Sequence, residues 1–212
     1  MNIPKCTNVP NEAFYECQLL EDINFPDCSY IGYDAFCNCS LITIASFPKC
    51  TYVSMTAFQM CSALTTAYFP KCSSIGFEAF ADCSSLQDIY FPECKYLSNC
   101  AFEGCESLSC ISFPACEYIG SETFEECSIL STASFPKCSY IGSQAFADCY
   151  ELWSLYLLSS SVVTLANSNA FDYTPLSADG SGTIYVPSSL YSDYISAQYW
   201  SDISARISAY TE

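Results

Sequence analysis

Cysteine is the residue type with the greatest chemical potential in this chain of 212 residues, which contains 17 cysteines and no histidine. Fourteen of the cysteines recur at intervals of eleven residues and so form two alternating columns, each with a period of 22 residues. One column is Cys6, Cys28, Cys50, Cys72, Cys94, Cys116 and Cys138, and the other is Cys17, Cys39, Cys61, Cys83, Cys105, Cys127 and Cys149. The three outside this spacing, Cys37, Cys100 and Cys110, are predicted to be the more exposed or reactive thiols.

Regular columns of cysteine are poorly suited to disulfides or to zinc. If coils stack at the spacing of β-strands, neighbours in a column lie about 4.8 Å apart with parallel side chains. A disulfide needs Cβ atoms about 3.8 Å apart and a χ3 angle of about 90°, and a linear ladder cannot place four thiolates in a tetrahedron. We therefore interpret the columns as buried thiols that act as small hydrophobic groups and weak donors. A bridged, secreted framework is the alternative.

The sequence offers little support for catalysis. Without histidine, a Cys or Ser nucleophile lacks its most common general base, and neither Gly-x-Ser-x-Gly nor a phosphate-binding glycine loop occurs. The net charge of −17 disfavours nucleic acid and anionic membrane surfaces as partners, because both attract clustered Lys and Arg. No apolar run approaches the roughly 18 to 20 residues of a membrane span. We predict a non-enzymatic protein without cofactor, metal, nucleic-acid partner or membrane insertion.

The elements that position these residues follow the same period. Phe stands three residues before each column cysteine from Cys17 onward, and a Pro begins each 22-residue unit. A fixed period of this length is typical of a solenoid, because one unit cannot bury its apolar face alone. Seven units begin at Pro4, Pro26, Pro48, Pro70, Pro92, Pro114 and Pro136.

One half of each unit is predicted to be a short strand. In residues 86–92, Leu86, Ile89 and Phe91 alternate with polar or amphipathic residues, and Pro92 ends the pattern. Stacked strands of this kind give one parallel sheet. The equivalent strands are expected near Leu20–Phe25, Ile42–Phe47, Leu64–Phe69, Leu108–Phe113, Leu130–Phe135 and Leu152–Leu157.

The other half of each unit is interpreted as a turn or irregular coil. Gly32, Gly76, Gly120 and Gly142 follow its apolar residue, which suggests a tight turn or a positive φ. Acidic residues recur beside them, and they offer either calcium ligands or, as the favoured interpretation, a solvated face. The acidic columns are Glu12, Asp34, Glu78 and Glu122, then Glu16, Asp82, Glu126 and Asp148.

The repeated pattern Ile75-Gly76-x-x-Ala79-Phe80-x-x-Cys83-Ser84-Ser85-Leu86-x-x-Ile89-x-Phe91-Pro92 resembles the leucine-rich repeats of the BspA-like type (leucine-rich repeat type 5). It departs from them by placing Phe before the Pro and Cys two residues after it. The resemblance covers residues 4–158 and implies a leucine-rich-repeat solenoid, horseshoe-like and mostly β and turn, with its strands lining one face. It also implies ligand or host-surface binding and a cell-surface or secreted location, although residues 1–4 form no signal peptide.

The repeat fades after Leu158, so we predict a solenoid domain over residues 1–158 and a C-terminal cap over 159–212. The segment Gly182–Pro187 restores one strand, and Ser188-Ser189 are suited to cap a helix over Leu190–Ile207. Such a cap shields the last coil and prevents edge-to-edge growth.

The outward residues of the strands form the candidate binding surface. Alternation points them away from the core, and they vary from unit to unit on a regular frame, as a recognition surface would. Tyrosine supplies contact area at low entropic cost. A protein or glycan ligand is therefore expected to bind Tyr68, Asp88, Tyr90, Ser112, Ser134 and Tyr156.

A second tyrosine stripe occupies the fourth residue after Pro, where packing of coil on coil is favoured over binding. Its members are Tyr30, Tyr52, Tyr96, Tyr118 and Tyr140. The first unit has no recognisable polar cap, which leaves a second function open: a self-assembling or spacer solenoid whose N-terminal coil docks another subunit.

Overall fold

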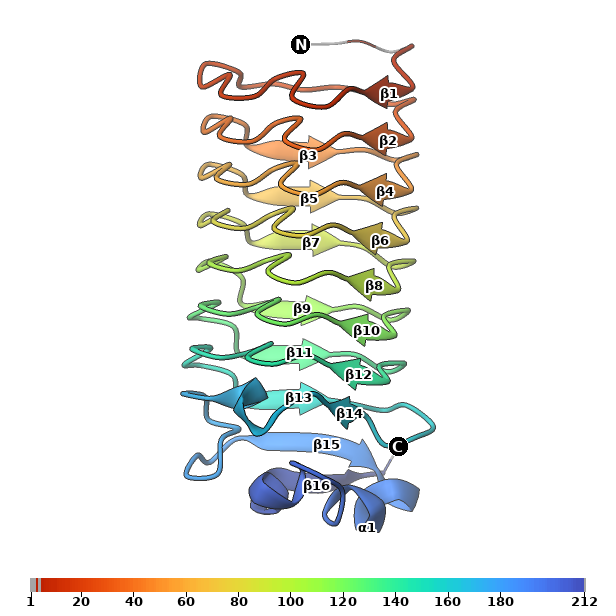
Figure 1. Ribbon diagram of the computed structural model, residues 1–212, viewed down its shortest axis with the longest axis vertical. Helices are drawn as coiled ribbons and strands as arrows, with labels where there is room; N and C mark the ends of the chain where they lie inside the picture. The colour runs from red at the N-terminus through yellow and green to blue at the C-terminus, as the bar shows by residue number, and fades with distance from the viewer. Residues whose placement is uncertain (1–2, 4, 212) are drawn as a thin grey trace.

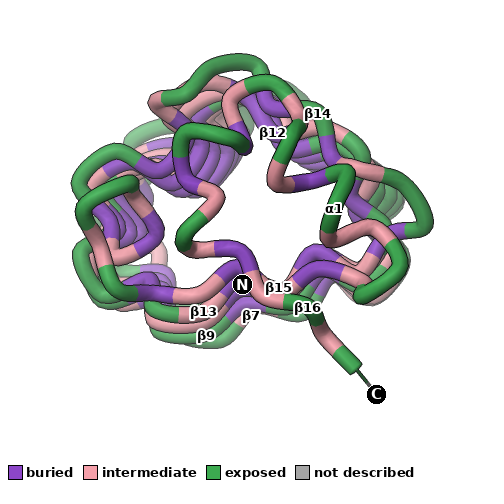
Figure 2. The backbone as a smooth tube through the Cα atoms, turned by 90° about the horizontal axis from the view of Figure 1, so that it is seen from below, coloured by how far each residue is buried: buried purple, intermediate pink, exposed green. Residues whose placement is uncertain are grey.

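The computed structural model describes residues 3 and 5–211 and is a parallel β-solenoid with a C-terminal cap (Figure 1). Met1, Asn2, Pro4 and Glu212 lie outside the described residues, and with them the predicted start of the first unit at Pro4 and most of the segment 1–4. Viewed along the axis, successive coils lie over one another and buried positions recur at the same places in each coil (Figure 2). The predicted leucine-rich-repeat solenoid with a 22-residue step is confirmed.

The predicted strands form two sheets on one side of the solenoid, which we call the strand face. The strands are shorter than expected, usually three residues, and the segment Leu20–Phe25 contains only an isolated bridge at Asn24. The first sheet is β3 (Ile44–Ser46), β5 (Thr66–Tyr68) and β7 (Asp88–Tyr90). The second is β9 (Cys110–Ser112), β11 (Thr132–Ser134), β13 (Ser154–Tyr156), β15 (Thr183–Pro187) and β16 (Ile207–Tyr210).

An eight-stranded parallel sheet on a second side corrects the interpretation of that half-unit as turn or coil. Each strand has two residues, so it holds a single apolar alternation and carries no recognisable period in the sequence. The first residue faces outward and the second lies in the core. The strands are β1 (Asn8–Val9), β2 (Tyr30–Ile31), β4 (Tyr52–Val53), β6 (Ser74–Ile75), β8 (Tyr96–Leu97), β10 (Tyr118–Ile119), β12 (Tyr140–Ile141) and β14 (Thr164–Leu165).

The third side of each coil, which we call the turn side, is a run of turns bonded to the next coil. Alternate main-chain N–H groups all point toward the C-terminal end: Glu12, Phe14 and Glu16 donate to carbonyls of the following coil at 2.9 Å. Glu12 and Glu16 have φ angles of 55° and 56°, and their equivalents in later coils are also left-handed. The acidic columns therefore occupy strained backbone positions that this hydrogen bonding requires.

The glycines of the repeat serve close packing rather than a positive φ. Gly32, Gly76, Gly120 and Gly142 do not have a positive φ, which among the described glycines occurs at Gly104 alone. A Cβ atom at Gly76 would lie 2.6 Å from the main-chain nitrogen of Met55 in the preceding coil, well inside contact distance. Of the two alternatives, a tight turn or a positive φ, the positive φ is wrong, and the close approach of two backbones explains the glycine.

Two columns of phenylalanine fill the interior. Within a column the rings stack, as for Phe58 and Phe80 with centroids 5.2 Å apart and planes 3° apart. Between columns they meet edge to face, as for Phe58 and Phe69 at 6.0 Å and 73°. Both arrangements suit the aromatic quadrupole, and each fully buried ring contributes about 1.5–3 kcal/mol.

The column cysteines are free thiols, and from Cys28 onward they are buried and donate to main-chain carbonyls, which confirms their interpretation as small buried donors beyond the first coil. In one column each thiol bonds its own coil, as Cys28 Sγ does with the Tyr30 carbonyl at 3.0 Å. In the other, from Cys39 onward, it bonds the preceding coil, as Cys61 Sγ does with the Phe36 carbonyl at 3.1 Å. Burial raises the pKa of Cys72 to about 11, so this thiol stays protonated and unreactive.

The prediction for the three cysteines outside the columns is partly wrong. Cys110 is exposed as expected, but Cys37 and Cys100 are buried among turn-side residues of adjacent coils. Desolvation, followed by nearby carboxylates, raises the pKa of Cys37 to about 11. Cys17, a column member in the first coil, is instead exposed because no described coil covers it.

The cap contains much less helix than predicted. Instead of one helix over Leu190–Ile207, the chain forms η2 (Ser188–Leu190), α1 (Tyr191–Tyr194) and η3 (Ser201–Arg206), after η1 (Ser168–Phe171). Ser188 and Ser189 cap no helix. The residues 207–210 pair as β16 with β15, the strand expected over Gly182–Pro187. The boundary at residue 158 stays a prediction.

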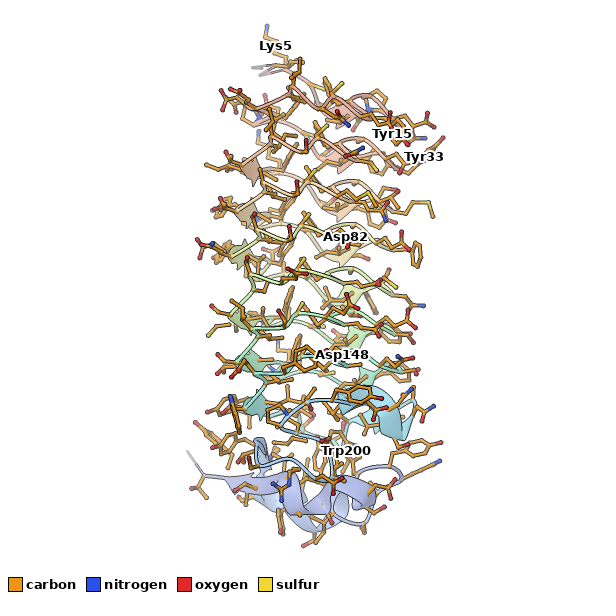
Figure 3. All side chains as sticks on the ribbon, turned by 90° about the vertical axis from the view of Figure 1, so that its left-hand side faces the viewer. Lys5, Tyr15, Tyr33, Asp82, Asp148 and Trp200 are labelled. Carbon is orange, nitrogen blue, oxygen red and sulfur yellow. The ribbon has the colours of Figure 1, made fainter. Side chains whose placement is uncertain are left out.

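Two aromatic anchors explain the compact cap. Trp200 Nε1 donates to the Val163 carbonyl at 2.7 Å, and the Val163 N–H donates to Tyr194 Oη at 3.1 Å. Both rings are fully buried against the last coil, and Figure 3 shows Trp200 at this end of the solenoid. A continuous helix would not bring both polar ring atoms to the main chain of one residue. Within the described residues, no helix is long and apolar enough to cross a membrane.

Candidate binding surface

The six predicted ligand-binding residues all lie at outward positions of the strand face. Tyr68 and Tyr90 are register partners in β5 and β7, and Ser112, Ser134 and Tyr156 are partners in β9, β11 and β13. Asp88 occupies the adjacent outward column on β7. The exposed members are Tyr68, Asp88, Tyr90 and Ser112, whereas Ser134 and Tyr156 are half-buried.

Tyr68 and Tyr90 form an exposed aromatic platform. Their ring centroids are 5.2 Å apart and their planes differ by 7°, so the rings stack face to face along the solenoid axis. Their exposed fractions are 41% and 50%. Their outer edges and hydroxyl groups are therefore available to a ligand, and Asp88 adds an exposed carboxylate on the same strand.

The main-chain ladder is interrupted directly beside this platform. Phe69 N–H donates to the Tyr90 carbonyl, joining β5 to β7, and Phe113 N–H donates to the Ser134 carbonyl, joining β9 to β11, both at 3.0 Å. No main-chain hydrogen bond between the described residues joins β7 to β9. Figure 1 shows a wider interval between these strands than between their neighbours. We call this gap the seam.

The coils on either side of the seam stay joined elsewhere. On the turn side, Phe80 N–H donates to the Ala101 carbonyl at 2.9 Å, and on the eight-stranded sheet Ser98 N–H donates to the Ile75 carbonyl at 3.1 Å. The Phe91 and Phe113 rings are 6.1 Å apart across the seam, compared with 5.1 Å for Phe69 and Phe91 on one side of it. The solenoid therefore opens on the strand face alone.

The inward side chains at the centre of the strands are bulky at the seam. The central inward residue of the strand is Ala in β3, β5 and β11, but Ile89 and Ile111 occupy it in the two consecutive strands β7 and β9. Leu155 and Ile184 occupy the same position in β13 and β15, which remain paired, so a large inward side chain does not by itself open the ladder. Two consecutive β-branched side chains at this position distinguish β7 and β9 from these other strands, and such overpacking costs stability in cores. Ile89 is accordingly only half-buried, whereas the equivalent Ala67 and Ala133 are fully buried.

Two adjoining hollows lie along the seam, and we call them together the seam groove. One encloses about 370 Å³ between Ile89, Phe91, Ile111 and the two prolines Pro92 and Pro114. The other, of about 340 Å³, extends from Tyr68 past Asp88 to Cys110. Tyr90 borders both hollows. The groove therefore has an apolar end and a polar, acidic end.

A second aromatic group lies at the C-terminal end of the strand face. Tyr156 stacks on Tyr185 with centroids 4.6 Å apart, and Tyr210 meets both rings edge-on at 6.0 and 6.3 Å. The structure thus separates Tyr156 from the Tyr68–Tyr90 platform. Tyr185 was missed although its strand was recognised, and Tyr210 carried no signal because β16 has no repeat pattern.

The tyrosine stripe on the eight-stranded sheet consists of the outward residues of its two-residue strands. Tyr30 and Tyr52 stack at 6.1 Å, and Tyr118 and Tyr140 stack at 4.7 Å. Desolvation, then the neighbouring Tyr140, raises the pKa of Tyr118. Packing between coils, the favoured interpretation, accounts for these four rings.

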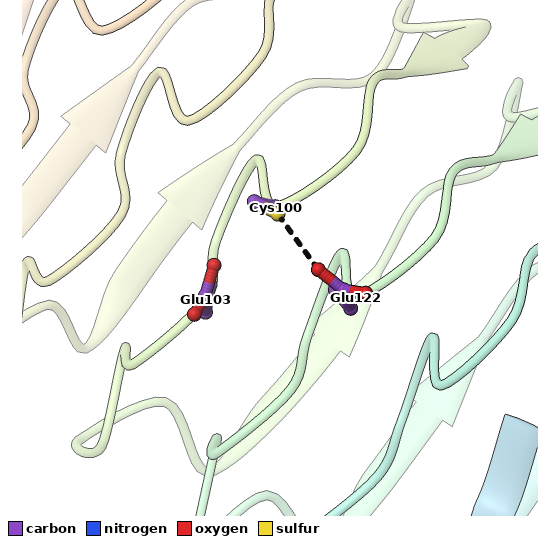
Figure 4. A group of neighbouring side chains, drawn as sticks. All are labelled: Cys100, Glu103 and Glu122. Atoms are coloured by element: carbon purple, nitrogen blue, oxygen red, sulfur yellow. Dashed lines mark hydrogen bonds between the residues drawn. The ribbon is translucent and has the colours of Figure 1, made fainter.

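The acidic columns of the turn side lie on one face, where Figure 3 shows Asp82 above Asp148. Cys100, Glu103 and Glu122 place one thiol and two carboxylates within 4.8 Å of one another (Figure 4). Cys100 Sγ donates to Glu122 Oε2 at 3.4 Å. Desolvation and then the two carboxylates raise the pKa of Cys100, and desolvation raises that of Glu103. The protonated thiol of Cys100 donates to one carboxylate, so a hydrogen bond holds these groups together and a metal ion is not needed to explain the cluster.

Carboxylates elsewhere on the turn side are paired with amides of the adjacent coil. Gln59 Nε2 donates to Glu78 at 2.7 Å, and Gln144 Nε2 donates to Glu125 at 3.2 Å. Desolvation, reinforced by Glu122 and other carboxylates, raises the pKa of Glu125 to about 7. Glu125 is thus partly removed from water, and the interpretation of the acidic columns as a solvated face stays a prediction.

A parallel solenoid with a uniform core and varied outward residues defines a repeat protein of the leucine-rich-repeat class. A family model described as "BspA type Leucine rich repeat region (6 copies)" matches residues 1–109 and 73–192. The chain belongs to this family. No curated protein sequence matches the chain.

Solved structures resemble the fold. The pneumococcal vaccine antigen PcpA superposes with a TM-score of 0.60 at 16% sequence identity, covering 80% of this chain and 41% of that one. A leucine-rich repeat protein from Bacteroides ovatus ATCC 8483 superposes with a TM-score of 0.50 at 23% identity, covering 85% of this chain and 58% of that one. This chain therefore spans about half the length of these two proteins.

Proposed function

We propose that the protein is a non-enzymatic binding or adhesion module that recognises a protein or a glycan through its strand face. The observation that carries this proposal is the exposed Tyr68–Tyr90 stack beside a groove, on an otherwise regular frame. Aromatic rings with free edges and hydroxyl groups, next to a carboxylate, offer apolar contact and hydrogen bonds to either ligand class. Ser112, Ser134 and Tyr156 extend this surface toward the cap.

The chemistry of the cysteines supports a non-enzymatic role. Burial raises the pKa of Cys39 and Cys138 to about 12, and a protonated thiol is a poor nucleophile. Leucine-rich-repeat proteins are typically binding proteins, and one structural neighbour is named as a vaccine antigen. Both facts support a cell-surface or secreted location for this chain.

Attachment to host cells and to a glycan array tests the proposal. Tyr68→Ala and Tyr90→Ala are expected to weaken binding by about tenfold or more, as loss of a central aromatic contact does. Tyr96→Ala is the matched control, because Tyr96 is equally exposed but lies on the eight-stranded sheet. Attachment that is unchanged in both strand-face variants would overturn the proposal.

A self-assembling or spacer solenoid is the second candidate function, and the first described coil favours it. Phe14 and Leu20 are only half-buried, whereas their equivalents Phe36 and Ile42 are fully buried, and Leu19 is 90% exposed. A second copy that stacks on this coil would cover these side chains. Light scattering over a wide range of concentrations tests this function: growing assemblies support it, and a strict monomer excludes it.

A further inference from the structure

We propose that the seam groove binds an extended peptide of a partner protein, which bonds the open main chain of β7 and β9 and places a basic residue against Asp88. The inference rests on the proposed function, because it specifies the ligand class of the same strand face. It commits to a peptide rather than a glycan for reasons that lie in the seam itself.

The seam exposes main-chain groups that the other coils use to bond one another. By the register of the neighbouring coils, Phe91 N–H would donate to the Ser112 carbonyl, and Cys110 N–H to the Gln87 carbonyl. Neither bond is present in the described chain. Unpaired ladder groups of this kind are satisfied when an extended peptide supplies its own N–H and C=O groups. A sugar carries no such regular alternation of donors and acceptors.

The groove has a place for an apolar side chain of that peptide. Ile89, Phe91 and Ile111 line its apolar end, and the prolines Pro92 and Pro114 close that end without offering N–H groups. Side chains of an extended peptide alternate between two faces. Every second residue would therefore point into the seam groove, while the residues between them contact the Tyr68–Tyr90 platform or solvent.

Charge selects a basic peptide. The chain has a net charge of −17, and Asp88 is exposed at the polar end of the groove. The ion pairs of the described chain use other acids, namely Asp27, Glu93 and Glu117, each with a lysine of an adjacent coil. Asp88 therefore has no internal cation to compete with Lys or Arg of the ligand. Complementary charge of this kind contributes to specificity and to the association rate.

The test uses blocked seven-residue peptides in which Thr alternates with an apolar residue and Lys stands at both ends. Binding is followed by fluorescence anisotropy and by the alkylation rate of Cys110, which borders both hollows, measured by mass spectrometry. Cys17, exposed in the first coil, is the internal control. We expect a peptide that binds to slow the alkylation of Cys110 by about tenfold at saturation and to leave Cys17 unchanged.

Three comparisons separate the seam from an unspecific surface. Two peptides are compared, one N-methylated at its odd-numbered amides and one at its even-numbered amides. Only one of the two sets faces the open main chain, so only one of the two peptides is expected to lose binding. Asp88→Asn is expected to weaken binding by about tenfold, whereas Glu151→Gln, an exposed site elsewhere, leaves it unchanged. Ile89→Ala combined with Ile111→Ala is expected to close the seam, slow hydrogen exchange at the Phe91 and Cys110 amides, and remove peptide binding.

The outcomes distinguish this inference from the proposed function. Peptides that never protect Cys110, or that bind equally well in both N-methylated forms, overturn the inference. If Tyr68→Ala and Tyr90→Ala still weaken attachment to cells or glycans in that case, the strand face remains the binding surface and only the ligand class is wrong. Asp88→Asn, a surface change, keeps the test valid if the double isoleucine variant does not fold.

Discussion

The interior of the solenoid and its strand face follow opposite rules. Inside, Phe and Cys recur at each step with nearly the same geometry, whereas the outward positions change from coil to coil. At the seam the interior affects the surface, because the inward residues Ile89 and Ile111 line the groove that opens on the strand face. Uniform packing thus provides the frame, and the groove lies where that packing changes.

The largest effect expected from the interior is alkaline unfolding. Burial raises the pKa of column thiols, for example to about 12 for Cys138, while the unfolded thiol titrates at about 8.5. The native state therefore holds protons that the unfolded state releases. This stabilisation is complete below pH of about 8.5 and is lost as pH rises toward the native pKa, by about 1.4 kcal/mol per thiol and pH unit.

With about a dozen such thiols, a domain stability of about 5–15 kcal/mol disappears within about one pH unit above that point. Circular dichroism between pH 7 and 11 should show one sharp transition, above which the signal of the folded protein is lost. A variant with Ala at Cys83, Cys105 and Cys127 should show a shallower transition. A fold that persists at pH 11 would contradict the burial of the ladders.

Truncating one ring inside and one outside tests the comparison next. Phe80→Ala removes a fully buried ring that stacks between Phe58 and Phe102, and should lower the free energy of unfolding by about 3–5 kcal/mol. Tyr90→Ala should change it by less than about 0.5 kcal/mol. Urea denaturation measures both values, and equal effects would remove the distinction between frame and surface.

Replacing a buried or an exposed cysteine should give the same contrast in the free energy of unfolding as the two ring truncations, with smaller values. Cys83 is fully buried and donates to the Phe58 carbonyl at 3.1 Å, so Cys83→Ala should cost about 1–2 kcal/mol in thermal unfolding. Cys110→Ala, on the exposed strand face, should cost almost nothing. A strong effect at Cys110 would mean that the strand face contributes to the frame.

The smallest expected effect concerns the turn side. Because the pKa of Glu125 is raised to about 7, its native carboxyl group holds a proton that the unfolded one loses at about 4.3. Its contribution to stability is present below pH 4.3 and is lost as pH rises to about 7. Glu125→Gln should therefore stabilise the protein at pH 8, by about 0.5 kcal/mol after screening, and not at pH 4. Glu151→Gln is the control.

The period made the fold predictable, but not the details that depend on neighbouring coils. Each Phe and column Cys repeats its environment, so one unit predicts the rest. Cys37 and Cys100 were misjudged because their burial depends on side chains of adjacent coils, which vary. The second sheet was missed because two-residue strands leave no alternation to recognise.

The candidate surface was predictable residue by residue, but its shape was not. Alternation correctly places Tyr68, Asp88 and Tyr90 outward. The seam coincides with two isoleucines in consecutive coils, where β5 and β11 carry Ala, and its position depends on packing between coils that one unit does not reveal. The cap was wrong as a helix because Tyr194 and Trp200 are held by Val163, a contact 31 and 37 residues away in sequence.

The one-way hydrogen bonding of the turn side makes the two ends of the solenoid chemically unlike. Each coil offers N–H groups to its successor, and the cap receives the last of them through the carbonyls of Ala170 and Asp172. The opposite end presents carbonyl oxygens instead. Two N-terminal ends placed face to face would oppose acceptor to acceptor on the turn side, so this side favours addition of a coil in the direction of the existing chain.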